Sequence, residues 1–105
     1  MKDSRHSSDP VREAALHRLL ASPVRLAILH ELRDGECPAG EVALRVGLAQ
    51  SPTSQHLARL RAGRLVLTRK VAQVVHYRIA ADVCEALDDM QRTTERLLGT
   101  LPAQS

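Results

Sequence analysis

LAQSPTSQHLARLR is the stretch that occupies residues 48–61. It opens with a Ser-Pro pair typical of a helix start, and its two later leucines are spaced to face one core. Upstream, a shorter segment of helical periodicity begins at Pro38 and stops at Gly47, a glycine in the position that ends helices. Two helices of roughly 8 and 12 residues joined through a glycine predict a helix-turn-helix, with its second helix over residues 51–62.

The segments on either side of this unit extend the pattern. Asp9-Pro10 and Ser22-Pro23 each place a capping side chain before a proline, so they predict two helices upstream, the second apolar on most sides and therefore the most buried. Downstream, β-branched segments within residues 65–79 alternate with a period of two and predict a hairpin.

The hairpin has two features that can be checked. Its second strand is expected to face Val75, Tyr77 and Ile79 inward and to present the alternate residues to solvent. Its tip, at residues 71–73, contains no glycine, so we expect a turn geometry other than the one that glycine favours.

The first and last helices carry apolar seams with no evident partner inside so small a fold. The last helix is expected over residues 82–98. Such seams favour a homodimer, although the two terminal helices could instead pack on each other within one chain. The predicted interface comprises Val11, Leu19, Val83, Leu87, Met90 and Leu97.

The order of elements predicts a mainly α fold with a small β-hairpin, a winged helix-turn-helix with terminal dimerisation helices. A single domain covers residues 10–98, between a flexible segment at 1–9 and a tail at 99–105.

Charge is unevenly distributed along the chain. The 105 residues carry 15 Lys and Arg against 12 Asp and Glu, a formal net charge of +3. Residues 42–81 hold seven basic side chains and no Asp or Glu. Because each carboxylate would repel phosphate, a segment that approaches a polyanion excludes them. The alternative interpretation is an arginine-rich solvated face.

Composition and motifs exclude several classes of protein. No run reaches the ~18 apolar residues that a membrane span needs, and the first residues lack a signal-peptide core. Two cysteines fit a reducing cytoplasm and are too few for a disulfide scaffold. No Gly-rich phosphate loop, H-E-x-x-H or nucleophile elbow occurs. We expect a cytoplasmic binding protein that is not an enzyme and uses no cofactor or membrane.

Three stretches carry a resemblance to a known family: LASPVRLAIL at 20–29, the 48–61 stretch, and VHYRI at 75–79. Together they resemble the ArsR/SmtB family of bacterial transcriptional repressors, over about residues 16–80. The resemblance implies a homodimer that binds double-stranded DNA at an inverted-repeat operator and is released by a small effector, which these residues leave unidentified.

In a helix-turn-helix, the early residues of the second helix meet base edges in the major groove. Gln55 offers a paired donor and acceptor suited to adenine, and Gln73 at the hairpin tip is expected to reach the minor groove. Two roles stay open for His56, DNA contact or packing on the preceding helices, and Ser51 can also cap its own helix. The predicted DNA-binding set is Gln50, Ser51, Thr53, Ser54, Gln55, His56, Arg59, Arg61, Arg69, Lys70 and Gln73.

The resemblance also bears on effector sites. Many members bind metal through two cysteines on the third helix, but the matching positions here hold Pro38 and Gly40. The five histidines precede residue 80, which removes the terminal-helix metal site, so no metal site is predicted. Cys37 and Cys84 leave open a thiol sensor of soft metals or oxidants, or two spectator thiols.

A different class of function fits the same fold. A winged helix can use a basic face to bind an acidic protein instead of DNA. Sequence-specific duplex binding with a steep salt dependence would favour DNA, because each neutralised phosphate adds about 0.9 to the log–log slope.

Overall fold

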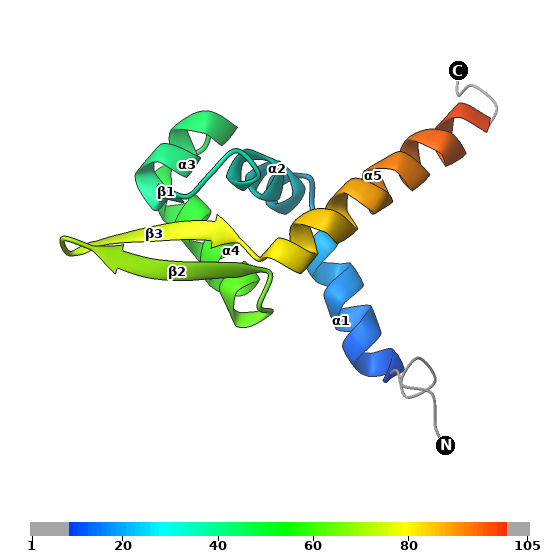
Figure 1. Cartoon of the computed structure of the whole chain (residues 1–105), viewed down its shortest axis with the longest axis horizontal. Coiled ribbons are helices and arrows are strands. Elements are labelled where there is room, and N and C mark those ends of the chain that lie inside the picture. Colours follow the sequence, from blue (N-terminus) through cyan, green and yellow to red (C-terminus); the bar gives the residue numbers. More distant parts are fainter. Residues whose placement is uncertain (1–8, 101–105) are drawn as a thin grey trace.

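The computed structural model describes residues 9–100. The flexible segment and tail expected at the termini therefore lie largely outside the described residues. Figure 1 shows a body of α2, α3 and α4, from which the β2–β3 hairpin extends on one side while α1 and α5 diverge on the other. The elements run α1 (Pro10–Leu20), α2 (Pro23–Leu32), β1 (Cys37–Pro38), α3 (Ala39–Val46), α4 (Gln50–Ala62), β2 (Val66–Val71), β3 (Val74–Ile79) and α5 (Ala81–Thr100).

The predicted caps form at the starts of the first two helices. Asp9 accepts a hydrogen bond from the Val11 backbone N–H at 2.9 Å, and Ser22 accepts one from the Arg25 N–H at 3.2 Å. Each cap precedes a proline in the first helical position, where a missing N–H leaves no bond unmade. Gly47, with a φ of 74°, ends α3 as expected.

The start of α4 differs from the prediction. Its N-cap is Ala49, two residues before Ser51, so Ser51 does not cap the helix. The Thr53 hydroxyl donates instead to the Ala49 carbonyl at 2.9 Å. Pro52 is accommodated in the first turn, where backbone N–H groups have no partner within the helix.

At the end of α4, the left-handed backbone conformation and the glycine fall on two different residues. Arg64, not Gly63, adopts the left-handed conformation, with a φ of 64°. Leu65 N–H donates to the Leu60 carbonyl and Arg64 N–H to the Arg61 carbonyl, both at 2.9 Å, which is the Schellman arrangement. Gly63 meets a tertiary constraint instead, because a Cβ built there would overlap Leu19 Cδ1 and the Leu19 side chain would have to shift.

The sheet contains one strand more than the predicted hairpin. Its order is β1-β3-β2, antiparallel throughout, and Cys37 of β1 lies opposite Tyr77 of β3. Two residues are too few to show a sequence periodicity. At the hairpin tip, Ala72 and Gln73 have φ values of 49° and 71°. These left-handed values are those of the turn that Asn-Gly favours, so the expectation of another geometry was wrong.

The core lies between α2, α4 and the start of the hairpin. Ile28, Leu29, Leu57 and Leu60 are fully buried, and α2 contributes more to the centre than α1, as predicted. Tyr77 and Ile79 are half-buried against this core, as expected. Val75, also expected inward, is exposed because the hairpin extends beyond the body (Figure 1).

Candidate nucleic-acid interface

The exposed face of α4 carries polar and basic side chains. Gln50, Ser51 and Gln55 are exposed near its N-terminus, and Ser54 is half-buried. Arg59 and Arg61 are exposed one to two turns later. These side chains offer hydrogen-bond donors and acceptors at the start of the helix, where a DNA-reading helix meets base edges, and positive charge further along it, which suits phosphate contacts.

Thr53 does not belong to this face. Its side chain is fully buried, although the sequence predicted it to bind DNA. It lies four residues before Leu57 and seven before Leu60, so it shares their core-facing side of the helix. The Ala49 carbonyl satisfies its hydroxyl, so the position tolerates threonine without an unpaired polar group.

His56 is half-buried and faces Arg25 of α2. The Arg25 Nη1 and His56 Nδ1 atoms are 3.4 Å apart, while Arg25 Nε donates to the Leu19 carbonyl at 2.7 Å. Burial, and then the nearby charges of Arg25 and Arg59, lower the pKa of His56. A neutral ring can accept the Arg25 hydrogen bond, so of the two open roles this geometry favours packing against α2. Arg25 is a residue that the sequence analysis did not single out.

The hairpin presents further predicted ligands. Arg69, Lys70 and Gln73 are exposed. Arg69, however, is already paired: its Nε donates to the two carboxylate oxygens of Glu36 at 2.8 and 3.0 Å, and its Nη2 lies 2.5 Å from Oε1. Glu36 precedes β1 and lies outside the acid-free stretch, so no sequence pattern placed it beside the hairpin.

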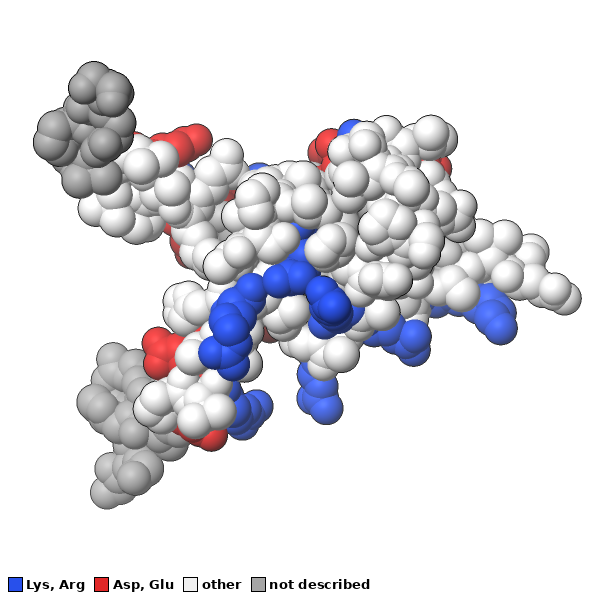
Figure 2. Space-filling view, turned by 180° about the vertical axis from the view of Figure 1, so that it is seen from behind, with Lys and Arg blue, Asp and Glu red and all other residues white. Residues whose placement is uncertain are grey.

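Basic side chains gather on one side of the molecule. Figure 2 shows them in a band across the lower half of that view, from the base of α1 toward the hairpin, with acidic side chains on the projecting helices and the opposite margin. The exposed basic residues of α4, the following turn and the hairpin are together called the basic surface here: Arg59, Arg61, Arg64, Arg69, Lys70 and Arg78. By the strand register, Lys70 lies on the opposite face of the hairpin from Arg69 and Arg78.

The residues predicted at the dimer interface fall into two groups. Leu87 is buried within the protomer at 3% exposure, and Leu19 and Val83 pack against the same core. Val11 and Met90 are exposed, as is Leu97. The first group therefore stabilises the protomer, because these side chains of α1 and α5 already pack on its core.

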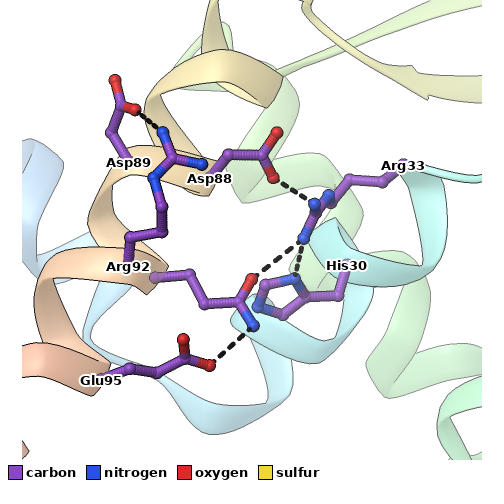
Figure 3. A network of polar contacts seen from close by, with 7 residues as sticks. His30, Arg33, Asp88, Asp89, Arg92 and Glu95 are labelled. Carbon is purple, nitrogen blue, oxygen red and sulfur yellow. Dashed lines mark hydrogen bonds and ion pairs between the residues drawn. The ribbon is translucent and has the colours of Figure 1, made fainter.

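A polar network joins the end of α2 to α5 (Figure 3). Arg33 forms an ion pair with Asp88, and its Nη1 donates to Gln91 Oε1 at 3.2 Å. The same Nη1 lies 3.1 Å from His30 Nδ1, and Gln91 Nε2 reaches Glu95 at 3.5 Å. The network links the end of α2 to successive turns of α5.

The two thiols occupy different environments. Cys37 is buried, and burial raises its pKa, so little of it is thiolate at neutral pH. Cys84 is half-buried on α5. Among residues 9–100, no three His, Cys, Asp or Glu side chains come together in a way that could hold a metal ion.

Known sequences match this chain over the segment that contains α2, α3 and α4. The family model of bacterial regulatory proteins of the arsR family matches residues 22–68. Nodulation protein NolR of Rhizobium meliloti is 48% identical over 63 residues, 60% of this chain and 52% of NolR, so the chain spans about half the length of that relative. The transcriptional activator HlyU of Vibrio cholerae is 40% identical over 79 residues, 75% of this chain and 73% of HlyU.

Solved structures show the same architecture. The homodimeric winged helix-turn-helix DNA-binding domain Mb0332 of Mycobacterium bovis has a TM-score of 0.82 and 25% identity, over 100% of this chain and 98% of that one. The mainly helical fold with its three-stranded winged sheet is therefore a winged helix-turn-helix, as predicted. Within residues 9–100, no helix combines the length and the apolar character needed to cross a membrane.

Proposed function

This chain belongs to the arsR family of bacterial regulatory proteins, and from that membership we propose that it is a homodimeric, sequence-specific DNA-binding regulator of transcription. It acts in the cytoplasm as a repressor that occupies an inverted-repeat operator. Its role is binding, and no catalytic step is assigned to it.

The observation that carries the proposal is the exposed face of α4 bordered by the basic surface. Gln50, Ser51 and Gln55 provide the hydrogen-bonding groups for base edges, and Arg59 and Arg61 provide charge for phosphates. The free N–H groups of the first turn of α4 add phosphate ligands, since no side chain caps them.

The second half of the proposal is the dimer. The exposed apolar residues of α1 and α5 supply a self-complementary surface of the kind that a two-fold axis requires. A two-fold axis between protomers places two α4 helices about 34 Å apart, one turn of DNA, and so requires an operator with two half-sites.

The proposal gives Cys37 no sensing role. A buried thiol with a raised pKa is a poor nucleophile and a poor ligand for soft metals, which bind thiolate. Treatment of the Cys84→Ser variant with arsenite or a disulfide reagent is therefore expected to leave its operator affinity unchanged.

Selection of duplexes from a randomised library by the full chain tests the proposal. The selected duplexes are expected to share an inverted repeat, and the dissociation constant is expected to rise steeply with salt. The double variant Ser54→Ala, Gln55→Ala should remove the preference for the selected over a scrambled duplex, while gel filtration and thermal unfolding show an unchanged dimer. Equal, weak binding of selected and scrambled duplexes by the wild-type chain would instead support a protein-binding winged helix.

A further inference from the structure

The carboxylate of Glu36 lies beside the basic surface, in contact with Arg69, although the two residues are 33 positions apart in the sequence. Glu36 precedes β1, and the pairing of Cys37 with Tyr77 holds it beside the hairpin. The residues opposite each other along the outer side of β2 and β3 are Arg69 with His76 and Leu67 with Arg78. The guanidinium charges of Arg69 and Arg78 both act on Glu36.

The contact between Glu36 and Arg69 is two-pronged. Both carboxylate oxygens accept from Arg69 Nε, at 2.8 and 3.0 Å, and Oε1 also meets Nη2. A guanidinium binds a phosphate with the same edge-on geometry. A DNA phosphate would therefore bind to the same edge of the Arg69 guanidinium. The hydrogen bond from Arg69 lowers the pKa of Glu36, which therefore stays ionised at neutral pH.

The pair is formed where water can reach it. The Arg69 side chain is 62% exposed and that of Glu36 only 24%. Exposed ion pairs contribute little net stability, so a phosphate can displace the carboxylate at small cost. Glu36 is the more enclosed partner, so it stays on the surface after displacement and repels the phosphate that replaces it.

From this geometry, and resting on the proposed function, we propose that Glu36 limits the affinity of the hairpin for DNA by competing with phosphate for the guanidinium of Arg69. The pair carries no net charge, so Arg69 adds little to non-specific attraction. A phosphate that contacts the guanidinium also faces the Glu36 carboxylate, so this contact adds little to the affinity of the wild-type chain for DNA.

The test is a double-mutant cycle on the selected duplex, measured over a salt series. Glu36→Gln should tighten binding about threefold to fivefold, the range that an exposed charge pair commands. It should also steepen the log–log salt slope by about 0.9, one added phosphate contact. Arg69→Ala should cost little in the wild-type chain but should abolish the whole gain in Glu36→Gln.

A matched control separates competition from general charge. Asp89→Asn makes the same change in net charge and frees Arg92, its ion-pair partner within α5, away from the hairpin. It should leave both affinity and salt slope near the wild-type values. Thermal unfolding of each variant establishes that it is folded.

The remaining outcomes overturn the inference in distinct ways. Weaker binding by Glu36→Gln would mean that Glu36 orients Arg69 for phosphate. A gain that persists without Arg69, or that Asp89→Asn reproduces, would mean a general charge effect. If the wild-type chain selects no duplex, the proposed function fails and takes this inference with it, whereas an unchanged affinity of Glu36→Gln beside specific wild-type binding refutes the inference alone.

Discussion

Arg64 holds a backbone conformation that arginine rarely adopts. Its φ of 64° places it in the left-handed region, which costs a residue with a Cβ about 1–2 kcal/mol. Glycine would relieve that strain, and glycine is the usual residue at this position after a helix. At the neighbouring Gly63, a side chain would displace the Leu19 side chain from its present position. A strained arginine on the basic surface is explained if its charge contributes to DNA binding.

Replacement of Arg64 by glycine is expected to raise stability and lower affinity together. Arg64→Gly should stabilise the chain by about 0.5–1 kcal/mol, because relief of strain exceeds the added entropy of the unfolded glycine. It should also weaken duplex binding and reduce the salt slope by about 0.9. Thermal unfolding and a salt series of dissociation constants measure the two effects.

Arg64→Ala is the control that separates charge from strain. It removes the same guanidinium but keeps a Cβ, so its affinity should match that of Arg64→Gly without the gain in stability. Equal melting temperatures for the two variants would contradict the role assigned to strain.

At the scale of elements, we expect the direction of α5 to depend on its contacts with the end of α2. Leu87 packs the base of α5 on the core, and Arg33 then ties the next turn through Asp88 and Gln91 (Figure 3). Because α5 carries part of the proposed dimer surface, a change in its direction alters the separation of the two α4 helices.

Arg33→Met keeps the apolar stem of the side chain and removes the tie. It should destabilise the protomer by about 1 kcal/mol or less, because the ion pair with Asp88 is partly exposed to solvent. Operator binding should weaken by a larger factor, since a dimer with altered spacing fits two half-sites poorly. Urea unfolding and duplex titration check both statements.

Arg92→Met offers a matched comparison for this variant. Arg92 pairs with Asp89 three residues away on the same helix, and both side chains are exposed, so its loss should change neither stability nor binding appreciably. Similar operator affinities for the Arg33 and Arg92 variants would show that the network does not set the direction of α5.

The whole molecule presents apolar surface on its two diverging helices. None of residues 10–20, which form α1, is buried, and Val11, Leu16 and Met90 are among the exposed apolar residues of the chain. Shallow apolar hollows lie on both sides of Met90, one against α2 and one against α1. An isolated protomer would leave this surface in water, which favours its burial against a second copy.

Met90→Glu is expected to produce a folded monomer that binds the operator poorly. Met90 is 39% exposed in the protomer, so a charge there should disturb the interface more than the core. Arg92→Gln makes the same change in net charge about 200° around α5 from Met90, on the opposite side of the helix, and should remain dimeric. Analytical ultracentrifugation at micromolar concentration distinguishes the two results.

A charged substitution at Leu87 would not test the dimer interface in the same way. At 3% exposure it belongs to the core, so a charge there should unfold the protomer. A dimeric Met90→Glu variant with full operator affinity would remove this part of α5 from the interface.

The sequence by itself determined the local elements. The caps at Asp9 and Ser22, the left-handed Gly47 and the two strands of the hairpin follow from hydrogen bonds and steric limits that act within a few residues. The exposed residues of α4, such as Gln55, were predictable for the same reason, because helical spacing fixes which side chains share a face.

Only the tertiary structure decided which of these residues are free to contact DNA or a second protomer. Glu36 meets Arg69 across 33 residues, and Arg33 meets Gln91 across 58. Thr53 and Leu87 left the predicted binding surfaces because neighbouring elements bury them. Contacts between distant segments depend on how the elements pack. The spacing of residues within one segment does not indicate which residue of another segment will contact it.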